Sequence, residues 1–70
     1  MQRIDVECEG VLWAVQFEVT EVDDITCEVT AKCRGQEVRC RVHASMPEAA
    51  IDVATNGVAR LAADAQLGAD

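Results

Sequence analysis

Apolar and polar residues alternate along residues 2–44, and a period of two is typical of strands that bury one face. The alternation falls into four stretches, which predict strands at about residues 2–8, 11–20, 25–33 and 37–44. Their apolar positions are Ile4, Val6 and Cys8; Val11, Trp13, Val15, Phe17 and Val19; Ile25, Cys27, Val29, Ala31 and Cys33; and Val38, Cys40, Val42 and Ala44. We therefore expect a sheet with one apolar and one polar face.

Short polar segments between the stretches predict how the strands connect. Glu9-Gly10 predicts a two-residue hairpin with Cys8 opposite Val11, because glycine readily adopts the positive φ that such a turn needs. The same rule predicts a turn at Gly35-Gln36. The second and third strands both have odd-numbered apolar positions, so residues 21–24 must form an odd-length loop or a bulge.

The predicted Gly35-Gln36 turn sets the register of the third and fourth strands. The resulting pairs are Arg34 with Glu37, Cys33 with Val38, Lys32 with Arg39, Ala31 with Cys40, and Glu28 with His43. Like charges directly opposite each other are destabilising, so the Lys32–Arg39 pair either relies on screening by solvent or awaits an anionic partner.

The period changes after Ala44, and residues 47–66 predict one amphipathic helix lying across the apolar face of the sheet. Its apolar stripe is Ile51, Ala54, Val58, Leu61 and Ala65. Ser45-Met46-Pro47-Glu48 has the form of a capping box. Asn56-Gly57 leaves open whether the helix is kinked, split or brought close to the sheet, and residues 67–70 are expected to fray.

These elements predict one α+β domain over residues 1–70, a four-stranded antiparallel meander with a carboxy-terminal helix on its apolar face. The alternative is a three-stranded sheet with a loosely attached first strand. A chain of 70 residues buries only about 60% of its unfolded surface. Because Trp13 and Phe17 are its only aromatic residues, the core must consist mainly of Val, Ile, Ala and Cys.

Charge is sorted along the chain, which has a net charge of −7. Residues 1–30 carry eight acids and one base, residues 31–44 four bases and one acid, and residues 45–70 four acids and one base. The candidate acidic surface is Asp5, Glu7, Glu9, Glu18, Glu21, Asp23 and Asp24, and the candidate basic surface is Lys32, Arg34, Arg39, Arg41 and His43. On the folded sheet, we expect an outer face that is acidic at the first strand and basic at the fourth.

The four cysteines, Cys8, Cys27, Cys33 and Cys40, all occupy apolar positions of their strands. We expect buried free thiols, because free cysteine behaves as a small hydrophobic residue. Their spacing lacks the close pairs typical of zinc sites, so no metal or cofactor is expected. In the predicted register Cys33 and Cys40 are diagonal neighbours, and whether they can form a disulfide stays open.

No catalytic site is predicted, so we do not expect an enzyme. His43 is the only histidine, the cysteines point to the other face of the sheet, and Ser45 is assigned to the helix cap. General acid–base chemistry needs a cleft and a positioned partner. No glycine-rich phosphate loop or calcium loop is present in the sequence.

The candidate basic surface allows three interpretations, and the candidate acidic surface allows two. A basic edge strand can simply prevent aggregation, bind an acidic protein, or bind nucleic acid, although the aromatic residues that usually stack on bases are missing from this face. The acidic row can simply aid solubility, or it can imitate nucleic-acid phosphates and bind a basic protein surface. Leu12 and Ala14 form a small apolar spot on the outer face, and an uncovered edge strand allows β-addition or a homodimer.

In size, negative charge and strand content, the chain resembles small acidic phage proteins that disarm bacterial CRISPR complexes. The resemblance concerns these general properties of the whole chain. It rests on no motif and assigns no functional residue. It implies a non-enzymatic inhibitor with a basic protein partner. The alternatives are a nucleic-acid-binding domain that uses the basic surface, and a small structural subunit of a larger assembly.

Neither a signal peptide nor an apolar stretch long enough to span a membrane is predicted. A cytoplasmic protein of a phage or its bacterial host is the expectation. The acidic balance disfavours binding to anionic membranes or directly to nucleic acid, because both are negatively charged.

Overall fold

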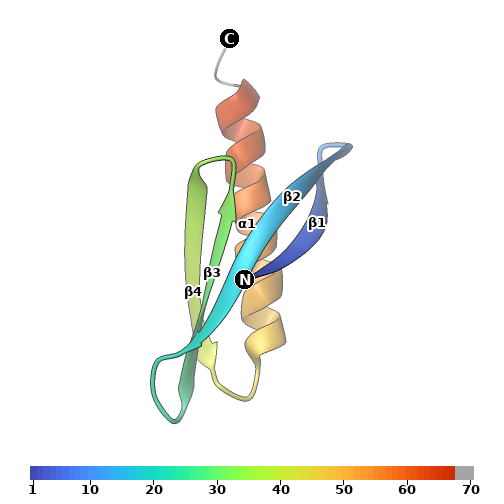
Figure 1. Ribbon diagram of the computed structural model, residues 1–70. Helices are drawn as coiled ribbons and strands as arrows, with labels where there is room; N and C mark the ends of the chain where they lie inside the picture. Colours follow the sequence, from blue (N-terminus) through green and yellow to red (C-terminus); the bar gives the residue numbers. More distant parts are fainter. Residues whose placement is uncertain (68–70) are drawn as a thin grey trace.

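The computed structural model describes residues 1–67. It consists of β1 (Gln2–Cys8), β2 (Val11–Glu21), β3 (Thr26–Cys33), β4 (Gln36–His43) and α1 (Pro47–Leu67). The strands form one antiparallel sheet in the order β1-β2-β3-β4, and α1 crosses one face of it (Figure 1). The predicted α+β meander is confirmed, and β1 pairs with β2 along its whole length. The fraying predicted at the carboxy terminus falls mainly on residues 68–70, outside the described residues.

The first hairpin has the predicted turn and register. Cys8 lies opposite Val11, and the two turn residues Glu9 and Gly10 have φ angles of 54° and 78°. Two consecutive positive φ angles are typical of a type I′ turn, whose twist matches that of the flanking strands.

The second hairpin turns one residue earlier than predicted. Its turn residues are Arg34 and Gly35, with φ angles of 48° and 83°, so Cys33 lies opposite Gln36 rather than Val38. Glycine therefore occupies the second turn position in both hairpins. The register differs from the prediction by two residues, which leaves every side chain on its predicted face, and for that reason the hydrophobic pattern could not detect the error.

The connection between β2 and β3 has the odd length that the pattern required. Glu21 lies opposite Cys27, with five residues between them. The backbone N–H groups of Val22 and Asp23 both donate to the carbonyl oxygen of Thr26, at 3.0 and 3.3 Å. This turn lets both strands direct their odd-numbered residues toward α1.

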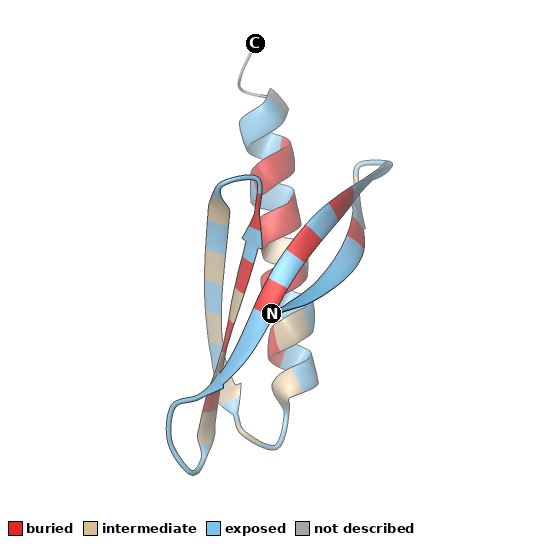
Figure 2. Cartoon of the chain, in the orientation of Figure 1, coloured by how far each residue is buried: buried red, intermediate tan, exposed pale blue. Residues whose placement is uncertain are grey.

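The core lies between the sheet and α1 (Figure 2). Val15 and Val29 are completely buried at the centre of the sheet, with Trp13, Phe17 and Ala31 beside them. The helix supplies mostly alanine to this core, together with one valine and one threonine: Ala50, Ala54, Thr55, Val58, Ala59, Ala62 and Ala63. The predicted stripe is therefore partly wrong, since Leu61 and Ala65 are exposed and the buried face is wider and rotated toward smaller residues.

One helix does not cover the whole apolar face. Of the predicted inward positions, Ile4, Val11, Val19 and Ile25 remain 39–63% exposed. They lie toward the β1 edge and the ends of the sheet, whereas α1 packs mainly over β3 and β4. The alternation correctly predicted which face these residues occupy, but the position of the helix decides which of them are buried.

The predicted capping box is not formed within residues 1–67. The helix begins at Pro47, and the hydroxyl of Ser45 lies 2.7 Å from His43 Nδ1 instead of accepting a bond from the first helical turn. The Ser45 N–H also donates to this nitrogen, at 3.2 Å. Ser45 thus takes part in the turn that joins β4 to α1.

Asn56-Gly57 does not break the helix, which is continuous from Pro47 to Leu67. A Cβ atom built on Gly57 would lie 3.9 Å from Val38 Cγ1, an ordinary van der Waals distance. The glycine therefore faces β4 without being required for close packing. Thr55, the buried polar residue of α1, donates its hydroxyl to the carbonyl oxygen of Ile51 at 2.7 Å.

We expect Gly57→Ala to raise the free energy of unfolding by about 0.5–1 kcal/mol, because alanine loses less backbone entropy in a helix and the space beside Val38 accepts a methyl group. Urea-induced unfolding measures the change. The reciprocal variant Ala54→Gly, at a buried position of the same helix, should lower the free energy of unfolding by about 1 kcal/mol or more. A destabilised Gly57→Ala protein would show that α1 and β4 lie closer together than described.

Candidate functional site

The seven carboxylates of the candidate acidic surface are all exposed, but the structure does not bring them together. Asp5, Glu7 and Glu9 lie on β1 and its turn, whereas Glu18, Glu21, Asp23 and Asp24 lie near the opposite end of β2. The molecule measures 45 × 17 × 17 Å, so the two groups occupy separate parts of a narrow body.

The first group lies beside an exposed apolar residue. Leu12 is 68% exposed and lies opposite Glu7, and its neighbour Ala14 lies opposite Asp5. We call Asp5, Glu7, Glu9 and Leu12 the acidic hairpin face. Its one basic neighbour within 4 Å, among residues 1–67, is Arg3, whose Nη2 lies 3.9 Å from Asp5 Oδ1. Glu7 and Glu9 have no basic side chain at that distance in the same described range.

In the second group, Asp23 has a structural role. Its Oδ1 accepts a hydrogen bond of 2.9 Å from the backbone N–H of Ile25, which closes the turn between β2 and β3. This bond, with smaller contributions from Thr26 and Arg41, holds the pKa of the Asp23 carboxyl below its ordinary value. A carboxylate engaged in this way is less free to bind a partner than its neighbours.

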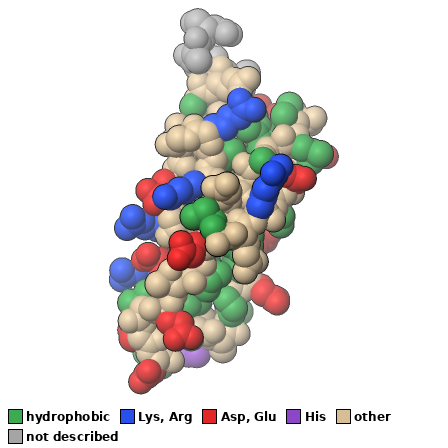
Figure 3. Space-filling view, viewed as in Figure 1, with side chains coloured by type: hydrophobic (Ala, Val, Ile, Leu, Met, Phe, Trp, Pro, Cys, Tyr) green, Lys and Arg blue, Asp and Glu red, His purple; other side chains and the backbone are tan. Residues whose placement is uncertain are grey.

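Two of the five residues of the basic surface are paired with neighbouring carboxylates, so charge on β3 and β4 is more mixed than the predicted register implied. Arg41 Nε lies 2.8 Å from Glu28 Oε2, and Arg39 Nε lies 3.5 Å from Glu37 Oε1. In the observed register Lys32 lies opposite Glu37 instead of Arg39, and Arg39 lies opposite Thr30. Figure 3 shows basic and acidic side chains interspersed over this face. The predicted like-charge pair does not exist.

Arg34 instead connects the two hairpins. From the β3–β4 turn, its guanidinium group lies over the ring of Trp13 on β2, 5.4 Å from the ring centre. Trp13 is buried, and its indole N–H donates to the carbonyl oxygen of Cys8 at 3.3 Å. A cation over a partly desolvated indole ring is stabilising by about 0.5–2 kcal/mol.

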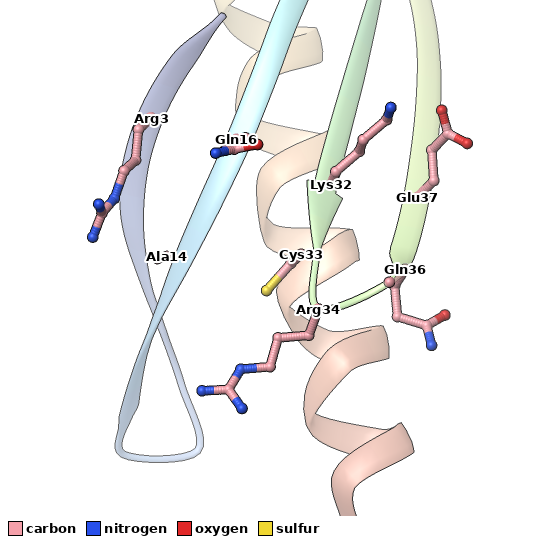
Figure 4. A pocket seen from close by; sticks show the side chains of 9 residues that line it. Arg3, Ala14, Gln16, Lys32, Cys33, Arg34, Gln36 and Glu37 are labelled. Atoms are coloured by element: carbon pink, nitrogen blue, oxygen red, sulfur yellow. The ribbon is translucent and has the colours of Figure 1, made fainter.

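A groove of about 600 Å³ opens beside Arg34, between the β1–β2 hairpin and the β3–β4 turn. We call it the inter-hairpin groove. In Figure 4, Arg34 extends toward β2, whereas the side chain of Arg3 points outward from β1 and that of Lys32 points from β3 toward β4. The lining includes Arg3, Ala14, Gln16, Lys32, Arg34 and Glu37. Three of the six Lys and Arg residues of the chain line this one groove, a concentration that the linear sequence does not reveal.

His43 has a different partner from the one predicted. It lies opposite Thr26, not Glu28, and its Nδ1 contacts the hydroxyl of Ser45 at 2.7 Å. In nucleophilic catalysis, a histidine beside a serine can act as the general base that activates the serine hydroxyl. Here both side chains are exposed, and the Ser45 N–H also donates to Nδ1, so we interpret the contact as part of the turn before α1.

The four cysteines are free, but they are not equally buried. Cys27 and Cys33 are buried, whereas Cys8 and Cys40 are half-buried. Burial raises the pKa of the Cys33 thiol, with a smaller opposing effect of the Arg34 charge. Cys33 lies opposite Gln36 and Cys40 lies opposite Val29, so the predicted diagonal neighbours are four residues apart in the register.

Comparison with protein-family models, with curated proteins and with solved structures found no match to the chain. Over residues 1–67, no group of three or more metal-ligating side chains is arranged to hold an ion. No helix in the same range is both long enough and apolar enough to cross a membrane. A functional proposal must therefore be argued from the geometry and charge of the surface.

The turn carboxylate predicts a pH dependence of stability. Because the pKa of Asp23 is lower in the folded protein than in the unfolded chain, its contribution is present above the unfolded value of about 3.9 and is lost as the pH falls through the folded value. NMR titration should find Asp23 titrating below the same residue in an unfolded peptide. Asp23→Asn should lack this part of the acid-induced destabilisation. An Asp23 pKa equal to that of the peptide would contradict the described turn.

The cysteine positions predict two classes of thiol. In native protein, Cys8 and Cys40 should react with a thiol reagent first, and Cys27 and Cys33 should react only as the fold opens. Mass spectrometry of partly labelled protein identifies the sites, and urea should make all four react alike. Early labelling of Cys33 would show that the inter-hairpin groove exposes its sulfur.

Proposed function

We propose that the protein is a non-enzymatic interaction module that binds a basic protein surface through the acidic hairpin face. The observation that supports this proposal is the combination found there: Leu12, two-thirds exposed, lies opposite Glu7 on a hairpin whose carboxylates are mostly unpaired within the described residues. Protein interfaces usually have an apolar centre and a polar rim, and the polar groups here are carboxylates that suit a basic partner.

The backbone of β1 strengthens this proposal. β1 is an edge strand whose only neighbour in the described sheet is β2, so its outer N–H and C=O groups are free to pair with a partner strand. Asp5 and Glu7 both project from the outer face of this strand. A basic partner can therefore contact side chains and backbone at once.

The alternative use of the basic surface has less support. Of its five residues, Arg39 and Arg41 are paired with carboxylates and His43 contacts Ser45. Binding a nucleic-acid phosphate would require Arg39 and Arg41 to exchange these partners. Binding would also work against the net charge of −7.

In its most specific form, the proposal is that the exposed carboxylates imitate nucleic-acid phosphates and block a DNA- or RNA-binding complex, such as a CRISPR effector. Carboxylates at both ends of a body 45 Å long offer a basic cleft two contact points. Such a contact should weaken as salt concentration rises, because exposed charges are screened.

The test is a competition experiment. A guide-loaded CRISPR effector and several other basic nucleic-acid-binding proteins are mixed with labelled target nucleic acid, with and without this protein. We expect it to displace the nucleic acid from at least one of them, and the triple variant Asp5→Lys, Glu7→Lys, Glu9→Lys to be weaker by at least about tenfold.

A matched control separates the surface from net charge. Glu48→Lys, Asp52→Lys, Asp64→Lys changes the charge by the same amount on exposed positions of α1, and it should retain most of the activity. If both triple variants lost the same amount of displacement activity, the effect would depend on overall charge and not on the acidic hairpin face. Salt-sensitive retardation of DNA or RNA by this protein alone would favour the nucleic-acid-binding alternative instead.

A further inference from the structure

The sheet divides into two hairpins at one end. The pairing of β2 with β3 begins at Gln16 and Lys32 and continues toward the β2–β3 turn. Beyond Gln16, in the other direction, residues 11–15 of β2 pair with β1 and with no other strand of the described residues 1–67. Figure 1 shows β2 diverging from β3 in this region, and the inter-hairpin groove lies where they separate.

This separation leaves free backbone groups on β2. In an antiparallel ladder, alternate residue pairs exchange both hydrogen bonds, and the pair that closes a two-residue turn is one of them. Cys8 and Val11 are that pair, so Val11, Trp13 and Val15 direct their backbone groups toward β1. Leu12 and Ala14 then direct their N–H and C=O groups the other way, toward the groove, where β3 does not reach them.

The charges around these free groups are positive on the side of the groove. Arg34 extends from the β3–β4 turn toward β2, Lys32 ends the paired part of β3, and Gln16 lies between Lys32 and Arg3 in the register (Figure 4). Glu37 is the acidic side chain of the lining, and its Oε1 lies 3.5 Å from Arg39 Nε. Asp5 and Glu7 lie on β1, about 10 Å or two strand spacings from a strand added on the groove side.

We propose that the inter-hairpin groove binds an extended acidic segment of a partner protein as an added strand. Its backbone pairs with Leu12 and Ala14, and its carboxylates contact Arg34 and Lys32. Main-chain pairing supplies affinity and the cations select the acidic sequence, as in other cases of β-addition. The small side chain of Ala14 leaves room on the floor of the groove. This site goes beyond the proposed function, because it uses the opposite edge of the hairpin and the opposite charge.

Short synthetic peptides test the proposal with the intact protein. The probe is a capped peptide of alternating Glu and Val. Its first comparison peptide has Lys in place of Glu, and its second has N-methyl groups on the backbone nitrogens that would pair with β2. Binding is followed by the backbone amide signals in NMR spectra. We expect the Glu–Val peptide to shift Leu12, Ala14 and Gly35 most, and to slow hydrogen exchange at the Leu12 and Ala14 amides.

The comparison peptides separate the contribution of main-chain hydrogen bonds to binding from the contribution of charge. The N-methylated peptide should bind about tenfold more weakly, because it loses main-chain hydrogen bonds, and the Lys peptide should not bind at this position. Lys32→Gln and Arg34→Gln should each weaken the Glu–Val peptide several-fold. Arg60→Gln removes the same charge from an exposed position of α1 and should leave the affinity unchanged.

Several results would overturn this site. One is equal binding of the Glu–Val and N-methylated peptides, and another is a set of shifted signals that lies outside the groove. Binding of inorganic phosphate or an oligonucleotide at the same residues, with no binding of the peptide, would assign the cations to a different ligand. Concentration-dependent self-association that excludes the peptide would make a second copy the occupant. Leu12 belongs to both sites, through its side chain on the acidic hairpin face and through its backbone in the groove. The two proposals are still tested separately, because the acidic hairpin face is tested with variants of Asp5, Glu7 and Glu9 and the groove with variants of Lys32 and Arg34.

Discussion

The structure depends on burying one face of a four-stranded sheet under a single helix. Only α1 is available for this among the described residues, and it meets the sheet mainly through alanine. Small side chains let helix and sheet approach closely, and alanine is also the residue that favours a helix most strongly. The consequence is a thin core in which Val15, Val29 and Val58 are the completely buried apolar residues with the largest side chains.

A single helix covers only part of the width of the sheet, and this explains why apolar residues near the β1 edge are exposed. Because α1 packs mainly over β3 and β4, Ile4 and Val11 on the other hairpin keep part of their apolar surface in solvent. The β1–β2 hairpin is therefore held by fewer tertiary contacts. Arg34 over the Trp13 ring is one of the contacts that join the two hairpins at the end where they separate.

The two turns decide the arrangement of charge on the outer face. Moving the second turn from Gly35-Gln36 to Arg34-Gly35 changes the neighbours of every residue of β4. Arg41 then lies opposite Glu28 instead of Thr30, and Lys32 lies opposite Glu37 instead of Arg39. A surface that is sorted in the linear sequence becomes mixed on β3 and β4, and carboxylates without basic partners remain on the acidic hairpin face.

The pattern of apolar and polar residues was enough to predict the elements, their order and the face that each strand residue occupies. Period two and period 3.6 are local properties, so the four strands and the helix could be predicted to within about a residue. Even the odd-length connection before β3 followed from parity. Exposure of the candidate acidic residues was predictable too, because they lie at polar positions or in turns.

The β3–β4 register, the rotation of α1 and the inter-hairpin groove depend on how the elements pack, and the pattern along the chain does not predict them. A two-residue shift preserves the side-chain pattern, so Cys33 opposite Gln36 and Cys33 opposite Val38 look alike in the sequence. The burial of Ala59 and Ala62 instead of Leu61 depends on how closely the helix approaches the sheet. The groove brings Arg3 next to residues some thirty positions away, and such long-range proximity arises only when packing sets where β2 leaves β3.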